Sequence, residues 1–473
     1  MARIRIPLGR TFGKGRSTAA GMQSSANLYP EPVEAEGRTD VVFYGTPGRA
    51  SFATIGGTPR GQLSAGGVHY VVNGSRLYSV NSSGTETDLG QIIGSGLVDM
   101  SFNGVNLDIV TDQDSYSFLP STATLSVISD GDFEPASSVT NLAGRSIFTR
   151  RGTGEFAWSS YLDSTAYNAL HFATAEAESD DLICARKVGN EVALIGANTV
   201  EWWYNTGDID SLFARVNAPA ASVGGVSRDA TLVVDSALTF PGRDGSAGGV
   251  GVYRAEGYSP RKISTPEIDG YLESVATLTD LHAFPFQSRG HLFYVLTNPN
   301  EWSFGWDVST NQWIPLKYGL WTMGAEPSGG WDATMFALNG QKQIIGSSDG
   351  NLYELQADTN TEGGAGIVRE VTSQQIHRSG KRCFMSRLEL DIEAGVGTTG
   401  NGNPTVFASW SDDGGKTWSQ PRESGMGAIG ENKWRAVWNA CGSFRQRIIK
   451  FRVSDAVKVA ILGSWADMTV GAH

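Results

Sequence analysis

Cysteine is scarce in this chain: three thiols, Cys184, Cys383 and Cys441, are spread over 473 residues and none belongs to a CxxC pair. A disulfide framework needs an even set of cysteines, and a structural zinc site needs paired thiols or histidines. The six histidines, at positions 69, 171, 282, 291, 377 and 473, show no HxxxH or HExxH spacing. We therefore predict reduced, mostly buried thiols and no metal site.

Charged residues are also few, at 18% of the chain, and the acidic ones outnumber the basic ones by 49 to 37. Proteins that grip DNA through its phosphates carry a basic stripe, which this sequence lacks. No apolar run reaches the roughly 18 residues of a membrane-spanning helix, and residues 1–27 lack the apolar core of a signal peptide. We therefore expect a protein without a membrane-spanning segment that is made and kept in a cytoplasm until lysis.

The first 40 residues show no regular alternation. Arg3, Arg5, Arg10, Lys14 and Arg16 make the beginning of the chain basic. We interpret residues 1–40 as an irregular, solvated N-terminal arm, since termini are seldom ordered unless they are tied down. Contact with DNA or with an acidic partner is the alternative for this arm.

Glycine and aromatic residues are abundant. The chain has 59 Gly, 13 Trp and 20 Phe, and its 40% hydrophobic content excludes a disordered protein. Such a composition is typical of short strands joined by tight turns. Helix signals are rare: residues 266–278 form one candidate, with Thr265 as N-cap and Pro266 in the first turn, and residues 166–177 form a weaker one.

A unit of apolar strand, Gly-containing turn and aromatic strand recurs along the chain. Asn-Gly between apolar runs favours a type I′ hairpin, whose two central residues need positive φ. The seven units cover residues 68–80, 98–118, 141–158, 188–204, 232–254, 291–306 and 335–355. This spacing is typical of propeller blades, which bury their faces by packing around an axis. We predict an all-β fold with a β-propeller of six or seven blades over residues 41–362.

A second all-β unit follows the propeller. Residues 363–366, Gly-Gly-Ala-Gly, read as a linker. Beyond it, alternating apolar segments at 387–392, 405–410, 434–438, 448–453 and 457–462 predict strands. We interpret residues 363–473 as a smaller C-terminal β-sandwich.

Two segments resemble motifs of hydrolases. Residues 346–350, GSSDG, match GxSxG, but a nucleophile elbow needs a strand, a turn and a helix, and strands flank this turn on both sides. Residues 411–418, SDDGGKTW, fit the Asp box of sialidase-type propellers, in which the aspartate caps its own turn. The single copy lies outside the propeller. We interpret both segments as hairpins.

The remaining candidates are carboxylate pairs and tryptophans. Asp112 with Asp114 and Asp208 with Asp210 resemble fragments of calcium loops, but neither pair continues into the Gly and Glu of an EF-hand. Tryptophans that could form a sugar platform stand at positions 202, 203, 302, 306, 313, 321 and 331, where packing between blades is the alternative. We predict no catalytic, cofactor-binding or metal-binding residue.

A larger set of segments resembles a known family. They are residues 27–31, 172–181, 192–204, 242–244, 251–265, 291–296 with Trp302, Asp307 and Trp313, then 410–415, 453–455 and 461–463. In number and order these segments resemble the phage packaged-DNA stabilisation proteins, the tail accessory or nozzle components of short-tailed bacteriophages. The resemblance extends from about residue 27 to about residue 470.

The resemblance implies a structural, non-enzymatic tail protein of the virion that completes the head. It implies a ring, of six copies, below the portal and adaptor proteins, which closes the DNA channel and later forms part of the ejection conduit. A tail needle or plug and tailspikes or fibres are the expected neighbours, and packaged DNA passes the lumen without sequence-specific binding. Assembly in the host cytoplasm is expected. As a hypothesis, the net charge of −12 keeps the duplex from adhering to the lumen. A glycan-binding or glycan-hydrolysing propeller, sialidase-like or an adhesin, is the alternative.

Overall fold

Strands make up most of the computed structural model, which describes residues 2–14, 22–33, 39–175, 180–208, 211–245, 248–299, 301–322, 327 and 329–471. Within these residues the prediction of an all-β protein is confirmed. The described chain has one α-helix, α1 (Pro266–Glu273), and one short 3-10 helix, η2 (Leu278–Asp280). Thr265 caps α1 by accepting a hydrogen bond from Ile268 N, so the first helix prediction is confirmed, with an earlier end. The described helix has neither the length nor the apolar composition to cross a membrane.

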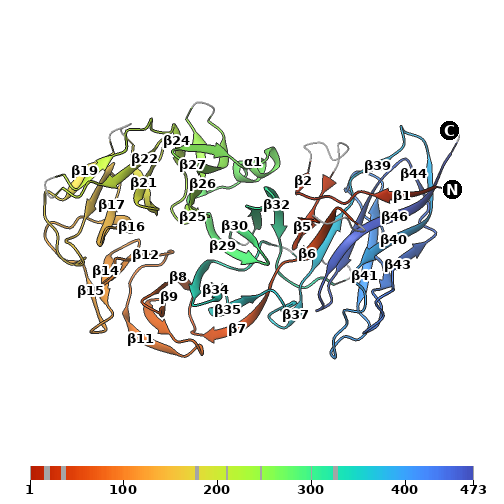
Figure 1. Cartoon of the computed structure of the whole chain (residues 1–473), viewed down its shortest axis with the longest axis horizontal. Helices are drawn as coiled ribbons and strands as arrows, with labels where there is room; N and C mark the ends of the chain where they lie inside the picture. The colour runs from red at the N-terminus through yellow and green to blue at the C-terminus, as the bar shows by residue number, and fades with distance from the viewer. Residues whose placement is uncertain are drawn as a thin grey trace.

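Seven antiparallel sheets in the described chain form a ring, which Figure 1 shows nearly face-on. The first three blades contain β8 (Pro59–Ala65), β9 (Val68–Asn73), β10 (Arg76–Val80) and β11 (Glu86–Gln91); β12 (Asp99–Phe102), β13 (Leu107–Val110), β14 (Ser115–Leu119) and β15 (Thr124–Val127); and β16 (Ala136–Leu142), β17 (Arg145–Arg150), β18 (Glu155–Trp158) and β19 (Phe172–Thr174). Blade 4 contains β20 (Leu182–Val188), β21 (Glu191–Gly196), β22 (Val200–Asn205) and β23 (Phe213–Arg215).

The remaining blades complete the circle. Blade 5 contains β24 (Val223–Gly225), β25 (Leu232–Val234), β26 (Ala237–Asp244), β27 (Val250–Glu256) and β28 (Ser259–Lys262), and blade 6 contains β29 (His282–Ser288), β30 (His291–Asn298), β31 (Trp302–Asp307) and β32 (Gln312–Leu316). Blade 7 contains β33 (Met335–Asn339), β34 (Lys342–Gly346), β35 (Asn351–Gln356) and β7 (Gly48–Thr54). The predicted propeller is confirmed, and it has seven blades.

The ring is closed by a strand from near the N-terminus. β7 precedes blade 1 in the chain but pairs with β35, with Ala53 opposite Leu352 and Arg49 opposite Leu355. One sheet thus joins both ends of the propeller. The first strands of successive blades contact one another around the ring, except in blade 5, where β25 contacts β20 and β29; β33 of blade 7 contacts β8 of blade 1.

Apolar clusters hold neighbouring blades together. One cluster joins Tyr70 of blade 1 to Ile109 of blade 2, and another joins Val71 of blade 1 to Ile344 of blade 7. Comparable clusters lie between each other pair of neighbouring blades. A blade therefore buries both of its faces against its neighbours, which is the physical reason for the repeat in the sequence.

The hairpin turns follow the predicted positions with a different geometry. The glycine has positive φ in Asn73-Gly74, at 55°, and in Asn103-Gly104, at 108°. Both residues have positive φ in Ala143-Gly144, at 51° and 75°. The predicted type I′ pattern is therefore wrong for Asn73-Gly74 and Asn103-Gly104. In these two pairs only the glycine has the positive φ that a side chain disfavours.

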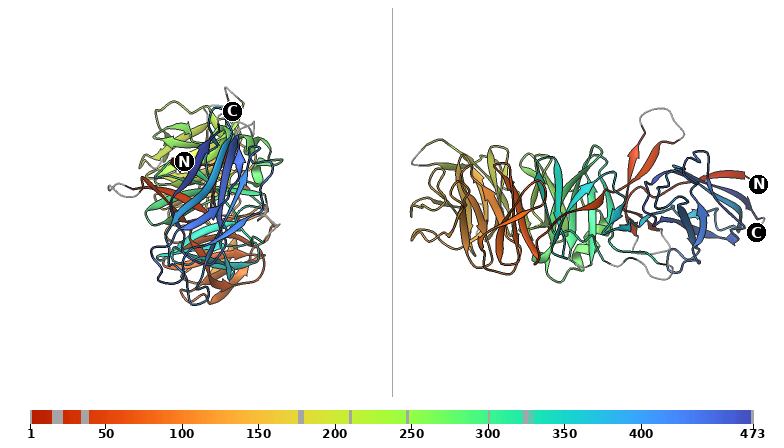
Figure 2. Two further views of the ribbon diagram at one scale, coloured as in Figure 1. Left: turned by 90° about the vertical axis from the view of Figure 1, so that its right-hand side faces the viewer. Right: turned by 90° about the horizontal axis from the view of Figure 1, so that it is seen from below.

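Beyond the ring lies a β-sandwich, at the right of Figure 1 and of the right-hand panel of Figure 2. Sheet 1 contains β1 (Ala2–Ile6), β5 (Leu28–Pro32), β6 (Val41–Gly45), β40 (Cys383–Ile392), β43 (Ala436–Asn439), β44 (Ser443–Phe444) and β46 (Ala460–Val470). Sheet 2 contains β4 (Ser25–Ala26), β38 (Arg369–Thr372), β39 (Ile376–His377), β41 (Thr405–Ser411), β42 (Arg422–Gly425) and β45 (Gln446–Val453). Two short hairpins stand apart, β2 (Gly13–Lys14) with β3 (Met22–Gln23), and β36 (Thr361–Glu362) with β37 (Ala365–Gly366).

The predicted irregular arm at residues 1–40 is wrong for the described part of that segment. β1, β4 and β5 lie within it and pair with strands of both sandwich sheets. β5 contains Pro30 and Pro32 and ends the strand order of sheet 1, where a strand tolerates prolines. The propeller is thus inserted between the N-terminal and C-terminal strands of one sandwich. Arg16 lies outside the described residues.

Two smaller predictions are also wrong. Residues 166–175 form a loop and β19, not a helix, and the expected linker at 363–366 belongs to the β36–β37 hairpin. In both segments the backbone pairs with a neighbouring strand, which outweighs weak local propensity.

Candidate functional site

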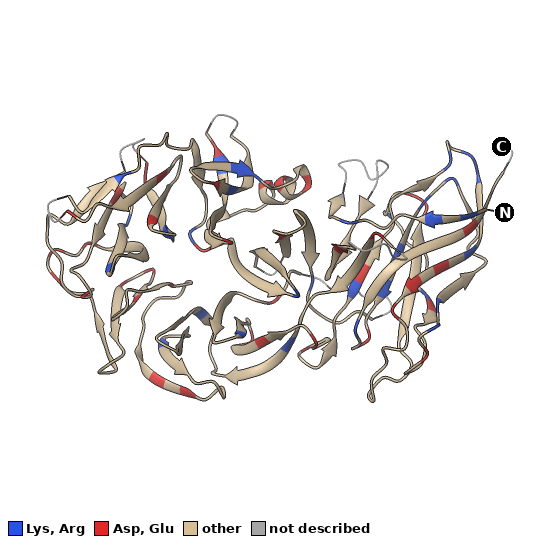
Figure 3. Ribbon diagram, viewed as in Figure 1, with Lys and Arg blue, Asp and Glu red and all other residues tan. Residues whose placement is uncertain are grey.

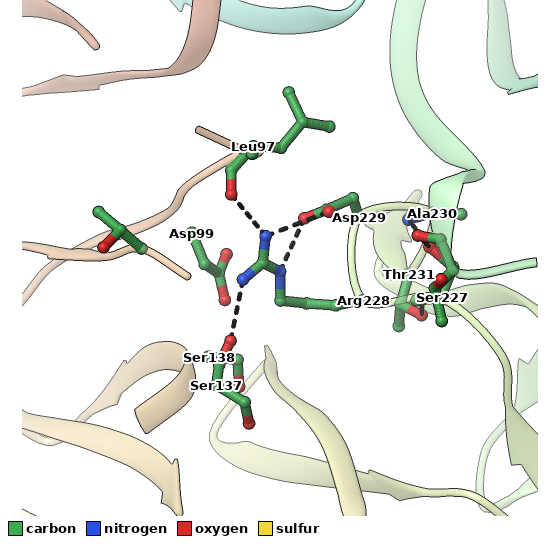
Figure 4. A network of polar contacts seen from close by, with 12 residues as sticks. Leu97, Asp99, Ser137, Ser138, Ser227, Arg228, Asp229, Ala230 and Thr231 are labelled. Atoms are coloured by element: carbon green, nitrogen blue, oxygen red, sulfur yellow. Dashed lines mark hydrogen bonds and ion pairs between the residues drawn. The ribbon is translucent and has the colours of Figure 1, made fainter. Parts of the chain in front are cut away.

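A polar network links blades 2 to 5 of the propeller, and Figure 4 shows it from close by. Arg228 follows β24 of blade 5, and its guanidinium donates to the carbonyl oxygens of Leu97, at 2.7 Å, and Ser137, at 3.0 Å. The same guanidinium pairs with Asp229 at 2.7 Å. Leu97 immediately precedes blade 2 and Ser137 lies in blade 3, so one side chain connects three blades.

A second arginine reinforces the network. Arg186 of β20 forms an ion pair with Asp99 of β12 at 2.8 Å and donates to the carbonyl oxygens of Thr231, at 2.9 Å, and Arg228, at 3.0 Å. Burial by itself would lower the pKa of Arg186, but the nearby charge of Asp99 raises it overall. The guanidinium therefore stays charged, and its donors are directed at fixed acceptors.

The contacts of Arg186 and Arg228 hold parts of the chain together. The donors of Arg186 and Arg228 are hydrogen-bonded to main-chain carbonyls and carboxylates of the same chain. Buried charges of this kind are stable when they are paired and hydrogen-bonded. In the part of the chain that the structure describes, no three His, Cys, Asp or Glu side chains are grouped to hold a metal ion.

A second polar cluster couples the propeller to the sandwich. Arg49 of β7 donates to the carbonyl oxygen of Asp332 at 2.5 Å and packs over the rings of Tyr318, at 4.7 Å, and Trp331, at 5.1 Å. Trp331 Nε1 donates to Glu362 Oε1 at 2.7 Å. Burial raises the pKa of Glu362, although Arg49 partly offsets this effect. The strand that closes the propeller is thereby fixed to the segment that enters the sandwich.

Arg369 of β38 continues this junction into sheet 2. Its guanidinium donates to the carbonyl oxygens of Val457, at 3.2 Å, and Thr46, at 3.2 Å, and to Asn360 Oδ1 at 3.1 Å. Burial lowers the pKa of Arg369 to about 10, so the group remains a cation at neutral pH. A side chain at Gly45 would come within 2.1 Å of Arg369 Nε, which explains the glycine there.

Blade 6 contacts the N-terminal strands directly. Asn27 Nδ2 donates to the carbonyl oxygens of Lys317, at 2.8 Å, and Val368, at 2.9 Å, and so joins propeller and sandwich. His291 of β30 lies 2.7 Å from Asp307 and 3.4 Å from Glu31 of β5. Burial lowers the pKa of His291, but Asp307 and Glu31 outweigh burial and raise it overall.

A cleft of about 880 Å³ lies beside this contact. Its lining includes Arg10, Glu31, Arg289 and His291. The two arginines already form ion pairs, Arg10 with Asp40 and Arg289 with Asp358. The cleft therefore offers little uncompensated charge to a ligand.

The structure places the hydrolase-like motifs in hairpins, as the sequence predicts. Residues 346–350 connect β34 to β35, and Ser347 and Ser348 donate to Asp332. In the Asp-box segment, Asp413 accepts hydrogen bonds from the main chain and side chain of Thr417, which lower the pKa of its carboxyl. These carboxylates and hydroxyls stabilise turns.

The other sequence candidates are dispersed. Asp112 accepts hydrogen bonds from Ser95, and Asp210 lies outside the described residues. Cys184, Cys383 and Cys441 are buried and unpaired. His69, His282 and His291 are buried, His171 is half-buried, His377 is exposed, and His473 lies outside the described residues. Of the seven tryptophans considered as a sugar platform, Trp321 is half-buried and the others are buried, so packing accounts for them.

Sequence reasoning missed the arginines that link blades 2 to 5 and the junction with the sandwich. Arg186, Arg228 and Arg369 belong to no motif, and their partners lie far away in the chain, 131 residues for Arg228 and Leu97 and 323 for Arg369 and Thr46. One signal was present: these arginines stand in or beside apolar strands, where an unpaired charge would be costly. That signal indicates a buried partner without identifying it.

Fold and site together define a rigid all-β structural protein whose polar clusters join its parts. The chain matches two family models in succession, bacteriophage P22 Gp10, β-propeller, over residues 5–360, and bacteriophage P22 Gp10, β-sandwich, over residues 369–469. It therefore belongs to the P22 Gp10 family of phage packaged-DNA stabilisation proteins, and as a member it is a structural protein of the virion.

Other comparisons add little. No curated protein matches the chain. Among solved structures, the N-terminal domain of Nup159 shares 10% identity at a TM-score of 0.43, covering 70% of this chain and 98% of that one. The Pan2 WD40 domain of Neurospora crassa shares 9% identity at a TM-score of 0.41, covering 65% and 95%. At these values the two structures say nothing about the function of this chain.

Proposed function

We propose that this protein assembles as a ring of six copies below the portal and adaptor proteins of a phage. There it extends and closes the DNA channel, retains the packaged DNA, and later forms part of the ejection conduit. The observation that supports this proposal is the match of both parts of the chain, in order, to the P22 Gp10 family. A tail needle or plug and tailspikes or fibres are its proposed neighbours, and assembly takes place in the host cytoplasm.

The proposed conduit runs between copies. Arg186 and Arg228 tie blades 2 to 5 of one subunit together, which suits a channel that is formed by several subunits. A net charge of −12 suits a wall past which DNA slides, because like charges repel. A lumen lined mainly by Lys and Arg would contradict this part of the proposal.

The proposed role is mechanical, without catalysis or a cofactor. Interlocked strands and buried ion pairs give a stiff subunit that suits a closed channel. The glycan-processing alternative receives no specific support: the Asp box lies in the sandwich, and the tryptophans considered for sugar binding are packed.

Electron microscopy of the purified protein with portal–adaptor complexes tests the proposal. We expect six-fold rings or capped channels, and heads that lack the protein should lose their DNA. Monomers that neither cap the complex nor affect DNA retention, or that hydrolyse a glycoside, would contradict it.

A further inference from the structure

The outer edge of blade 2 is open. β15 forms this edge and pairs with β14 on its inner side, with Tyr116 opposite Val127. Ile128 N donates to the carbonyl oxygen of Ser115 at 2.9 Å. Because hydrogen-bonded and non-bonded pairs alternate in an antiparallel ladder, the N–H and C=O groups of Leu125 and Val127 point away from β14. Within the described chain these groups make no hydrogen bond, and Figure 1 shows β15 on the rim of the ring.

The chain itself covers the outer edges of two other blades. On blade 6, Phe12 N donates to the carbonyl oxygen of Trp313 of β32 at 2.8 Å. On blade 7, Gly48 N of β7 donates to the carbonyl oxygen of Thr359, just before β36, at 2.9 Å. On these two blades a segment from elsewhere in the chain thus bonds to the main chain of the outer strand.

The two covering segments are alike in composition. Residues 11–13 are Thr-Phe-Gly and residues 359–361 are Thr-Asn-Thr, so neither segment carries a charge at the contact. Phe12 belongs to the apolar cluster of blade 6, where its ring centroid lies 5.0 Å from that of Phe304. At an outer edge this fold thus accepts an uncharged segment with hydroxyl residues, which on blade 6 also supplies an apolar anchor.

The remaining blades other than blade 2 have protected edges. β11 of blade 1 carries Glu86 and Asp88, and β28 of blade 5 contains a proline and two basic residues. β19 of blade 3 and β23 of blade 4 have three residues each. Charges, prolines and very short strands hinder edge-to-edge pairing. By contrast, residues 121–129 contain no charged residue and no proline, and Figure 3 shows acidic positions on β11 but none on β15.

An apolar surface reaches the open edge from blade 1. Leu125 packs on Gly90 of β11, where an added side chain would come within 2.8 Å of Leu125 Cδ2. Val127 is 47% exposed. Ile93 N donates to the hydroxyl of Tyr116, the residue opposite Val127, at 3.0 Å, and Ile93 is 36% exposed. A strand added to β15 would therefore place alternate side chains on this apolar surface, which continues the cluster between blades 1 and 2.

We propose that the open edge of β15 binds an extended segment of another tail protein, which adds to blade 2 as a fifth strand. The segment is uncharged, with apolar residues toward blade 1 alternating with serine or threonine, because β15 carries no charge and residues 11–13 cover blade 6 with the same residue types. Main-chain hydrogen bonds give such strand addition its affinity, and the alternate side chains give it specificity.

The matching uncharged edge of a second copy of this chain is the alternative occupant. Pairing of two β15 edges is isologous, so it closes after two copies and does not build the proposed ring of six. The occupant is therefore a different protein of the tail. This inference rests on the proposed function and assigns one contact through which the ring binds a neighbouring component.

Hydrogen exchange of the full chain tests the edge, first in the free protein and then in assemblies with portal–adaptor complexes, tail needle and tailspikes. In the free protein the amides of Leu125 and Val127 should exchange faster than that of Ile128, which is bonded to Ser115. In the assembled tail both should slow about tenfold or more, because a hydrogen-bonded amide exchanges after its bond opens. Unchanged exchange in tails that contain the ring overturns the inference, while the ring proposal stands.

A charge on the edge provides a matched comparison. Val127→Lys removes no hydrogen bond of the described chain and should fold as the wild type does, but it should weaken the binding of one tail component about tenfold or more. Val68→Lys makes the same change at a valine that is 38% exposed on β9, which pairs on both sides, and should bind every component normally. Co-sedimentation with adaptor, needle and tailspike measures binding, and thermal unfolding verifies the fold. Equal binding by both variants contradicts the inference.

A cross-link identifies the occupant. Val127→Cys provides an exposed thiol for a photoreactive cross-linker, because the three native cysteines are buried. In assembled tails we expect a cross-link to an uncharged segment of another tail protein. A cross-link between two copies of this chain, or the absence of any cross-link, overturns the inference. If the wild-type chain forms no ring on portal–adaptor complexes, the proposed function fails, and the inference fails with it.

Discussion

Arg186 in blade 4 and Asp99 in blade 2 form a 2.8 Å ion pair, although blade 3 lies between them. Apolar clusters join neighbouring blades, whereas this pair joins blades that share no face. The propeller therefore has two levels of connection, one around the ring and one across it. Separating blade 3 from blade 2 or from blade 4 would therefore also disturb the ion pair between Arg186 and Asp99, which suits a part of a closed channel.

Arg228→Ala should destabilise the propeller by about 2 kcal/mol or more, because it removes bonds to Leu97 and Ser137 and leaves Asp229 without its cation. Denaturant unfolding measures this loss. Arg261→Ala removes an arginine that is 73% exposed and is the control, with a change near zero. Equal stability of the two variants would contradict the role assigned to Arg228.

Asp108→Asn should change how stability depends on pH. Burial raises the pKa of Asp108 to about 7, with Ser146, Ser164 and Ser117 partly offsetting the effect. Between about pH 4 and pH 7 the folded chain holds a proton that the unfolded chain releases, so the free energy of unfolding falls as the pH rises. The asparagine variant lacks this decline, which is on the order of 4 kcal/mol.

Thermal unfolding of the Asp108→Asn variant at pH 5 and pH 8 measures the difference. Relative to the wild type, the variant should gain stability at pH 8. Asp181→Asn, at an exposed position, is the control and should follow the wild-type profile. A variant profile parallel to that of the wild type would show that Asp108 titrates normally.

His291→Gln should weaken the contact between blade 6 and β5 at acidic pH. Asp307 and Glu31 raise the pKa of His291 against the effect of burial, so its contribution is present below the ordinary histidine pKa and is lost as the pH rises past the raised value. The variant should therefore melt earlier than the wild type at pH 5.5 and resemble it more closely at pH 8.5. His377→Gln, at an exposed position, is the control; an equal effect of both changes at pH 5.5 would refute the prediction.

Shortened chains test the closure of the ring. A chain that begins at residue 46 keeps β7, whereas one that begins at residue 59 lacks it and leaves blade 7 with three strands. Both lose N-terminal sandwich strands, so the comparison isolates β7. We expect the shorter chain to unfold at a lower denaturant concentration and to be cut by protease in blade 7. Equal resistance would mean that β7 does not lock the propeller.

Much of the propeller could be predicted because its signals are local. Each of the seven repeated units falls within one blade, and Thr265 caps the predicted helix. Alternating burial, positive φ at a glycine and helix capping act over a few residues, so a short window of sequence contains them. The candidate motifs at residues 346–350 and 411–418 were rejected on the same local grounds.

The sequence by itself determined the strands, most turns and the repeat, and hence the fold class. Tertiary structure alone decided that β7 closes blade 7, that β1 and β5 join the sandwich, and that Arg228 reaches Leu97 across 131 residues. The physical reason is range: strand propensity depends on neighbouring residues, whereas strand pairing and buried ion pairs depend on which distant segments meet in space.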